Sequence, residues 1–301
     1  MLNQSHIQRI VFGCGNFGGI GSSPSLRDVG DDEAQALQLL DHAREVGIRR
    51  FDTANTYGGG ASEFVLGKWL RRQGASFIDQ AQIATKVGNP NGCPPGETPL
   101  SARQIALHLD QSLQRLGVER IDLYYIHEFD GVTPLEETLD AMSDAVEAGK
   151  IDRFGVSNAS LSDVEEVGRL CPARLAGRFE YVQNEYNLLA TADAQALMPY
   201  CARHGLRYTA FSPLAGGLLT GKYRLNEEPP RGSRLAHARE IYSTYLNAEC
   251  FGAIETLRKS AEACGRSIAE AALRFVLETP GVDGLIIAPR RMDQFGDLGF
   301  R

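Results

Sequence analysis

The sequence predicts an α/β fold in which eight parallel strands, each followed by a helix, close into one barrel. Short apolar runs alternate with longer amphipathic ones along the whole chain, as in repeated strand and crossover-helix units. Eight such apolar runs can be counted. The length of 301 residues lies in the range where a barrel of this kind remains one domain. We therefore expect residues 1–301 to form a single (β/α)8 TIM barrel.

The predicted strands are short, apolar and bounded by polar or glycine-rich turns. They lie at residues 10–15, 48–54, 81–87, 121–127, 153–158, 181–186, 206–213 and 284–289. A doubly wound open sheet also alternates strands with helices, so alternation by itself leaves both folds open. Eight units without a second domain favour the closed barrel.

The predicted helices have apolar residues three and four positions apart, and glycine follows several of them. The clearest five lie at residues 31–47, 62–74, 101–117, 134–149 and 162–170. Ser62 and Glu63 follow a run of glycines and form a pattern typical of a capped helix start.

Residues 222–238 are the most irregular segment and follow the seventh strand. Pro229, Pro230 and Gly232 break the periodicity there. Such a loop is either a lid over a ligand or a solvated excursion, and loops this long are more often functional. We expect a lid.

The composition limits the partners of the protein. A formal net charge of -7 argues against a nucleic-acid surface or an anionic-membrane anchor, since both need clustered Lys and Arg. No run approaches the about 20 apolar residues of a membrane span, and the N-terminus lacks the pattern of a secretion signal. The six cysteines form no CxxC pair, which indicates free thiols in a reducing compartment. A cytoplasmic protein is expected, and assembly into a homo-oligomer stays open.

The histidines do not predict a metal site. The six are scattered, with no HExxH motif and no helical pair at ligand spacing. We expect no catalytic metal.

Four polar side chains fall at or just beyond the ends of predicted strands: Asp52, Tyr57, Lys86 and His127. Each has a structural explanation by itself, as a turn cap, a packed ring, a solvated charge or a core histidine. The carboxyl ends of parallel barrel strands open on one face, where active sites of this fold lie. Their joint placement therefore favours catalysis.

These four groups suit the delivery of a proton. A free tyrosine has a pKa of about 10, and a nearby ammonium lowers it by favouring the phenolate. Lys86 can supply that charge and Asp52 can hold the lysine by a salt bridge. His127 can donate a hydrogen bond that orients a carbonyl oxygen and stabilises charge growing there.

The sequence resembles the aldo-keto reductases from about residue 10 to residue 294. The segments that carry the resemblance are FDTANTYG, SEFVLGKWL, IATKVG, SLQRLGVERIDLYYIHEFD, TPLEETLDAM, GKIDRFGVSN, VQNEYNLL, FSPLAGGLLTGKY and PPRGSR. The branch it resembles includes potassium-channel beta subunits and aryl-alcohol dehydrogenase-like reductases.

The resemblance implies reduction of an aldehyde or ketone by hydride transfer from NADPH, which is expected in preference to NADH. Tyr57 would be the general acid, Lys86 and Asp52 would tune it, and His127 would orient the small-molecule carbonyl substrate. Two alternatives stay open: an NAD(P)-dependent alcohol or sugar dehydrogenase, and an NADP-binding regulatory subunit.

The resemblance also implies cofactor contacts along the chain. The nicotinamide end would meet Ser157, Asn158, Gln183 and the ring of Phe211. The stretch from Ser212 to Lys222 offers a hydroxyl, glycine-rich backbone and an ammonium, which suit a pyrophosphate. Its expected contacts are Ser212, Leu214, Gly216, Leu218 and Lys222. The 2'-phosphate and adenine would meet Arg290, Arg291 and Gln294.

Two features depart from the family pattern. Ala288 stands where the family usually has glycine. The helix that should cover one side of the barrel would begin close to residue 301, so we expect the final helix to be incomplete. The sequence leaves the physiological substrate open and is compatible with medium-sized aldehydes, including aromatic ones.

Overall fold

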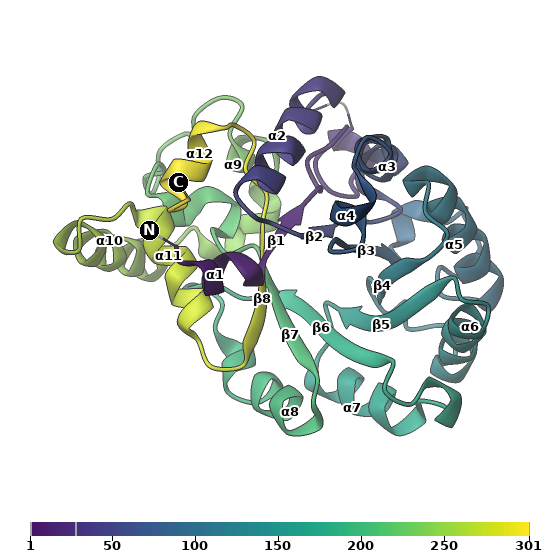
Figure 1. Ribbon diagram of the computed structural model, residues 1–301. Helices are drawn as coiled ribbons and strands as arrows, with labels where there is room; N and C mark the ends of the chain where they lie inside the picture. Colours follow the sequence, from purple (N-terminus) through teal and green to yellow (C-terminus); the bar gives the residue numbers. More distant parts are fainter. Residues whose placement is uncertain (1, 28, 301) are drawn as a thin grey trace.

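The computed structural model describes residues 2–27 and 29–300, in which eight parallel strands form a closed barrel in sequence order (Figure 1). Pairing of β1 with β8 closes the ring. The strands are β1 (Ile10–Gly13), β2 (Arg50–Asp52), β3 (Gln82–Val87), β4 (Ile121–Ile126), β5 (Ile151–Ser157), β6 (Phe179–Glu185), β7 (Arg207–Phe211) and β8 (Val282–Ile287). Each predicted strand overlaps an observed one, so the predicted barrel is confirmed.

Helices surround this ring (Figure 1). The longer ones are α2 (Glu33–Glu45), α3 (Ala61–Leu70), α5 (Ala102–Leu116), α6 (Leu135–Glu147), α7 (Leu161–Leu170), α8 (Leu197–His204), α10 (Ala248–Ala263) and α11 (Ile268–Glu278). The shorter ones are α1 (Gln4–Arg9), α4 (Ala75–Ile78), α9 (Arg234–His237) and α12 (Asp293–Asp297). The 3-10 turns are η1 (Pro24–Leu26), η2 (Tyr57–Gly60), η3 (Pro90–Gly92), η4 (Ala173–Leu175), η5 (Ala192–Ala194), η6 (Ala215–Thr220) and η7 (Arg239–Tyr245).

Local sequence sets several helix ends. The Asp32 side chain accepts a hydrogen bond from the backbone amide of Gln35 and caps α2. Ser160 and Asp163 form a capping box at the start of α7. Gly117 ends α5 with a φ of 68°, a left-handed conformation that suits glycine. In the described residues, none of the helices is both long and apolar enough to cross a membrane.

The predicted capping role of Ser62 and Glu63 is wrong. Helix α3 begins at Ala61, after Gly60 has taken a φ of 99°, and no side chain caps it. The buried Ser62 hydroxyl instead donates to the carbonyl of Cys14, and the buried Glu63 carboxylate accepts from Thr85 and Arg115. Both side chains face the barrel, so they fasten the helix to it and cannot reach the helix terminus.

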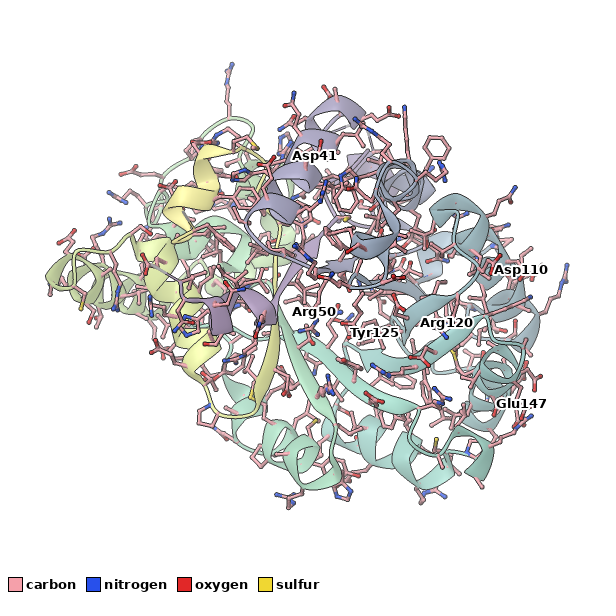
Figure 2. All side chains as sticks on the ribbon, viewed as in Figure 1. Asp41, Arg50, Asp110, Arg120, Tyr125 and Glu147 are labelled. Carbon is pink, nitrogen blue, oxygen red and sulfur yellow. The ribbon has the colours of Figure 1, made fainter. Side chains whose placement is uncertain are left out.

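The interior of the barrel is filled by a small cluster of buried side chains, namely Ala84, Leu123, Tyr125 and Tyr181. Figure 2 shows Tyr125 within the ring of strands. Layers of this kind make the centre of such a barrel a packed core. The cluster separates the two ends of the barrel, so each end presents its own set of polar side chains.

Candidate active site

The four predicted catalytic residues lie at the carboxyl ends of adjacent strands. Asp52 is the last residue of β2, and Lys86 is paired with Tyr125 near the end of β3. His127 follows β4, where its amide donates to the carbonyl of Val87 at 2.7 Å. Tyr57 begins the turn η2 that leads from β2 to α3. Barrel geometry therefore brings together residues that are up to 75 positions apart, from Asp52 to His127.

Lys86 is the centre of a buried hydrogen-bond network. Its Nζ donates to Asp52 Oδ1 at 2.5 Å, to the Thr53 carbonyl at 2.8 Å and to Tyr57 Oη at 3.3 Å. Burial alone would lower the pKa of Lys86, but the Asp52 carboxylate and the Tyr57 hydroxyl outweigh it and raise that pKa. All three ammonium donors are used, so Lys86 is held as a cation beside the phenol.

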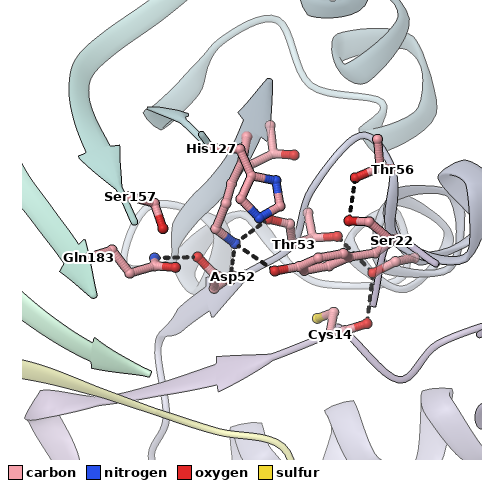
Figure 3. A network of polar contacts seen from close by, with 12 residues as sticks. Cys14, Ser22, Asp52, Thr53, Thr56, His127, Ser157 and Gln183 are labelled. Carbon is pink, nitrogen blue, oxygen red and sulfur yellow. Dashed lines mark hydrogen bonds and ion pairs between the residues drawn. The ribbon is translucent and has the colours of Figure 1, made fainter. Parts of the chain in front are cut away.

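Gln183 belongs to the same network. Its Nε2 donates to Asp52 Oδ2 at 2.9 Å, so each carboxylate oxygen of Asp52 has a partner (Figure 3). The sequence predicts Gln183 only as a cofactor contact. The structure gives Gln183 a further role, because its amide group holds the Asp52 carboxylate that in turn binds Lys86.

Tyr57 contacts both Lys86 and His127. Lys86 Nζ is 4.9 Å from the centre of its ring, and its ring meets that of His127 edge-on with centroids 5.7 Å apart. Burial raises the pKa of Tyr57 and outweighs the lowering effect of Lys86. Lys86 therefore lowers the pKa of Tyr57 as the sequence predicts, but burial has the larger effect and the net change is upward. The phenol keeps its proton at neutral pH and is available as a donor.

His127 is neutral in this environment. Its side chain is buried, and burial together with the positive charge of Lys86 holds its pKa well below 6.5. Its Nδ1 is buried and has no hydrogen-bond partner among the described residues. A neutral imidazole carries one N–H donor, which can serve an uncharged carbonyl oxygen placed beside Tyr57.

Replacement of His127 by glutamine is expected to make stability less sensitive to acid. The unfolded chain protonates this histidine near its ordinary pKa of about 6.5, whereas the folded protein resists protonation. Its contribution to stability is therefore fully present above about pH 6.5. As pH falls below that value, the free energy of unfolding should drop by up to about 1.4 kcal/mol per pH unit. Denaturant unfolding at several pH values measures the difference, and equal slopes for wild type and His127→Gln would contradict a neutral His127.

Three of the residues predicted for the nicotinamide end lie at or just beyond the carboxyl ends of β5 and β7. Asn158 has a φ of 53° and donates through Nδ2 to the His127 carbonyl at 3.0 Å and to Ser157 Oγ at 3.3 Å. Ser157 is buried at the end of β5, and Phe211 ends β7 with its ring partly exposed. The strand ends β4, β5 and β7 thus place these groups on the face that carries Tyr57.

The segment predicted for a pyrophosphate has the backbone shape that this role needs. Left-handed φ values occur at Ser212, Ala215, Gly216 and Gly217. Turns of this kind can direct amides at an anion, although those of Ala215 and Gly217 donate to the carbonyls of Ser212 and Leu214. A Cβ added to Gly216 would lie 2.4 Å from the ring of Tyr242, so this position requires glycine. Leu214 is partly exposed, Leu218 is buried and Lys222 is exposed in the same segment.

Arg290, Arg291 and Gln294 lie together beyond β8, but each has a partner within the protein. Arg290 Nε donates to Asp31 Oδ1 at 2.7 Å, and Arg291 forms a paired contact with Asp293. The Gln294 side-chain oxygen accepts from the backbone amides of both arginines. Asp31 is 259 positions from Arg290, and its involvement could not be read from the sequence.

Arg234 is a residue that the sequence analysis did not single out. It begins α9 inside the predicted lid, and its positive charge is close enough to favour the ionised form of Tyr57. Its Nε also donates to Tyr242 Oη at 3.1 Å. The only signal in the sequence is the PPRGSR segment, which ends in this arginine. This part of residues 222–238 therefore lies close enough to Tyr57 for its charge to act there, and its role as a lid stays a prediction.

Metal ligands are not grouped in the part of the chain that the structure describes. No set of three or more His, Cys, Asp or Glu side chains there is arranged to hold a metal ion.

Comparisons with known proteins identify a family and several relatives of this chain. The model of the aldo/keto reductase family matches residues 9–298. The uncharacterized oxidoreductase YrpG of Bacillus subtilis (strain 168) is 32% identical over 299 residues, which cover 97% of this chain and 86% of YrpG. L-glyceraldehyde 3-phosphate reductase of Escherichia coli (strain K12) is 32% identical, over 93% of this chain and 79% of that enzyme. Aldo-keto reductase yakc [NADP(+)] of Schizosaccharomyces pombe is 31% identical, over 85% of this chain and 73% of its own length.

Proposed function

Because this chain belongs to the aldo/keto reductase family, we propose that it reduces aldehydes or ketones to alcohols with NADPH, Tyr57 being the general acid. The observation that carries this proposal is the buried chain of hydrogen bonds from Gln183 through Asp52 and Lys86 to the Tyr57 hydroxyl. A cation fixed beside a phenol that keeps its proton is suited to proton delivery.

The residues present fit a nicotinamide dinucleotide. The left-handed turns after β7 suit the pyrophosphate, and Ser157, Asn158 and Gln183 offer polar groups near Tyr57. When bound, the reduced cofactor supplies the hydride. The proposed contacts along it are Ser157, Asn158, Gln183, Phe211, Ser212, Leu214, Gly216, Leu218, Lys222, Arg290, Arg291 and Gln294.

The side chains orient the substrate, deliver the proton and stabilise the charge that remains. The His127 imidazole holds the substrate carbonyl oxygen beside the Tyr57 hydroxyl, which gives its proton to that oxygen. Lys86 stabilises the phenolate that is left, at an Nζ to Oη distance of 3.3 Å. Asp52 keeps Lys86 in place, and both are buried, so solvent water screens this pair weakly.

A panel of aldehydes and ketones assayed with NADPH and with NADH tests this function. Short aldehydes, including a phosphorylated one, belong in it because a relative is named for L-glyceraldehyde 3-phosphate reduction. Loss of NADPH absorbance with at least one carbonyl is expected. Faster oxidation of alcohols or sugars would favour the dehydrogenase alternative. Tight NADP binding without turnover would favour the regulatory subunit.

Replacement of both Arg290 and Arg291 by alanine is expected to weaken NADPH binding by roughly ten- to a hundredfold, because a charged hydrogen bond is worth about 1.5 to 3 kcal/mol. NADH binding should change little, because NADH lacks the 2'-phosphate that a guanidinium would bind. Quenching of protein fluorescence on titration with each nucleotide measures both affinities.

Two controls separate recognition from stability. Arg290→Ala leaves Asp31 buried without its ion-pair partner, whereas the partner of Arg291 is the exposed Asp293. Arg291→Ala alone therefore reports on the phosphate with little structural cost, and Arg169→Ala on the exposed face of α7 matches its charge change. Equal losses for both nucleotides would mean that the arginines support the fold and do not bind the phosphate.

A further inference from the structure

A polar cavity lies at the amino ends of the strands, opposite Tyr57. Its volume is about 270 Å³. It is lined by Gln8, Arg50, Gln82, Arg153, Tyr181, Arg207 and Asp283. Arg50, Gln82 and Arg207 are the first residues of β2, β3 and β7. Figure 2 shows Arg50 within the ring of strands, and the packed cluster of Ala84, Leu123, Tyr125 and Tyr181 closes the cavity toward the candidate active site.

We propose that this cavity binds a phosphate dianion, either inorganic phosphate or the phosphate group of a small monoester. The proposal is independent of the carbonyl-reductase function. It rests on two guanidinium groups that converge without a carboxylate partner, on a hydrogen-bonded scaffold that holds them, and on the size of the cavity.

Arg50 and Arg207 have uncommitted donors. Arg50 Nε donates to Gln82 Oε1 at 3.0 Å, and its Nη1 lies 3.5 Å from the Asp283 carbonyl. Arg207 Nη1 donates to Tyr181 Oη at 3.2 Å. Within the described part of the chain, neither guanidinium has a carboxylate within the 4.0 Å of an ion pair. Their remaining N–H groups are free to meet an anion, and a guanidinium fork matches two phosphate oxygens.

A continuous set of hydrogen bonds fixes the spacing of these two arginines. Arg50 donates to Gln82, whose Nε2 donates to Tyr181 Oη at 3.4 Å, and Arg207 donates to the same hydroxyl. Tyr181 is 1% exposed, so this link is anchored in the core. A Cβ added to Gly284 would lie 3.0 Å from Arg50 Nη1, which shows that glycine leaves room for the guanidinium. A site held in this way loses little side-chain entropy on binding.

The local charge also favours an anion. The cavity lining contains three arginines and one carboxylate, that of Asp283. Arg153 is partly neutralised by Glu180 at 3.2 Å and Asp152 at 3.5 Å. No carboxylate neutralises Arg50 or Arg207 in this way among the described residues, so the cavity is locally positive. The chain as a whole carries a formal charge of -7. A bound dianion would reduce the repulsion between the Arg50 and Arg207 guanidinium groups.

The volume of the cavity indicates the size of its ligand. A volume of about 270 Å³ far exceeds the about 10 to 15 Å³ that one bound water needs, so a ligand of several heavy atoms fits. That accommodates a phosphate or a small phosphate monoester.

Isothermal titration of the NADPH-saturated protein with inorganic phosphate, with glycerol phosphate and with sodium chloride at matched ionic strength tests the proposal. Saturation with NADPH keeps added phosphate out of the cofactor site. We expect one phosphate site per chain and no equivalent binding of chloride. Tighter binding of glycerol phosphate that Arg207→Gln weakens would identify a monoester as the ligand of the cavity, and tighter inorganic phosphate would identify the free anion. Heats no larger than those of sodium chloride would overturn the proposal.

Variants at the cavity locate the site. Arg207→Gln, at an exposed strand start, should weaken phosphate binding by about tenfold or more. Gln8→Glu puts a carboxylate at the mouth without altering the barrel and should weaken binding by roughly three- to tenfold. Gln4→Glu on the same short helix α1 is the matched control and should leave the affinity unchanged, because Gln4 does not line the cavity. Unchanged affinity in both Arg207→Gln and Gln8→Glu, with folding intact by circular dichroism, would refute this location.

Discussion

Tyr57→Phe is expected to lower kcat for carbonyl reduction by about 10²- to 10⁴-fold, the usual worth of general acid catalysis. The substitution removes the hydroxyl to which Lys86 donates at 3.3 Å, and with it the proton that the substrate oxygen needs. The ring itself remains, so its edge-on contact with His127 should persist. NADPH binding should therefore stay nearly intact.

Tyr124→Phe is the matched control for this change. Tyr124 lies on β4, is fully buried, and its hydroxyl has no hydrogen-bond partner among the described residues. Removal of that hydroxyl should leave kcat unchanged and cost no stability. Single-turnover assays and NADPH titrations on both variants make the comparison. Near wild-type turnover in Tyr57→Phe would rule out its role as the general acid.

Lys86→Met is expected to affect both catalysis and stability. The free energy of unfolding should fall by about 3 to 5 kcal/mol, because Asp52 is only 3% exposed and would remain as a buried charge without its cation. Activity should fall as well, because the phenolate formed from Tyr57 loses the adjacent ammonium. Lys86 lowers the pKa of Tyr57, so its removal raises that pKa further. The alkaline limb of the residual activity should then move to higher pH.

The double variant Asp52→Asn with Lys86→Met separates these two effects. An asparagine removes the unpaired charge and still has an oxygen to accept from Gln183. Denaturant unfolding should show partial recovery of stability, whereas kcat should stay as low as in Lys86→Met. Recovery of activity together with stability would mean that Lys86 acts only by supporting the fold.

The sequence alone was enough to predict the eight strands and the meeting of Asp52, Tyr57, Lys86 and His127. Apolar runs of strand length recur eight times along the chain, and such runs need burial wherever they fall. The fold then requires that the carboxyl ends of parallel strands share one face. Both inferences depend on local pattern and on the general geometry of a barrel, so they need no knowledge of particular contacts.

Only the tertiary structure could decide which partners the polar groups have. Gln183 lies 131 positions from Asp52 and Arg290 lies 259 positions from Asp31, yet each pair is in hydrogen-bond contact. The net direction of the shift in the Tyr57 pKa is set by burial, which outweighs the effect of Lys86. Strand register and the packing of helices on the barrel set these distances and the degree of desolvation. Neither leaves a signal in the local sequence, because hydrogen bonds and charge effects depend on separations of a few ångströms between residues far apart in the chain.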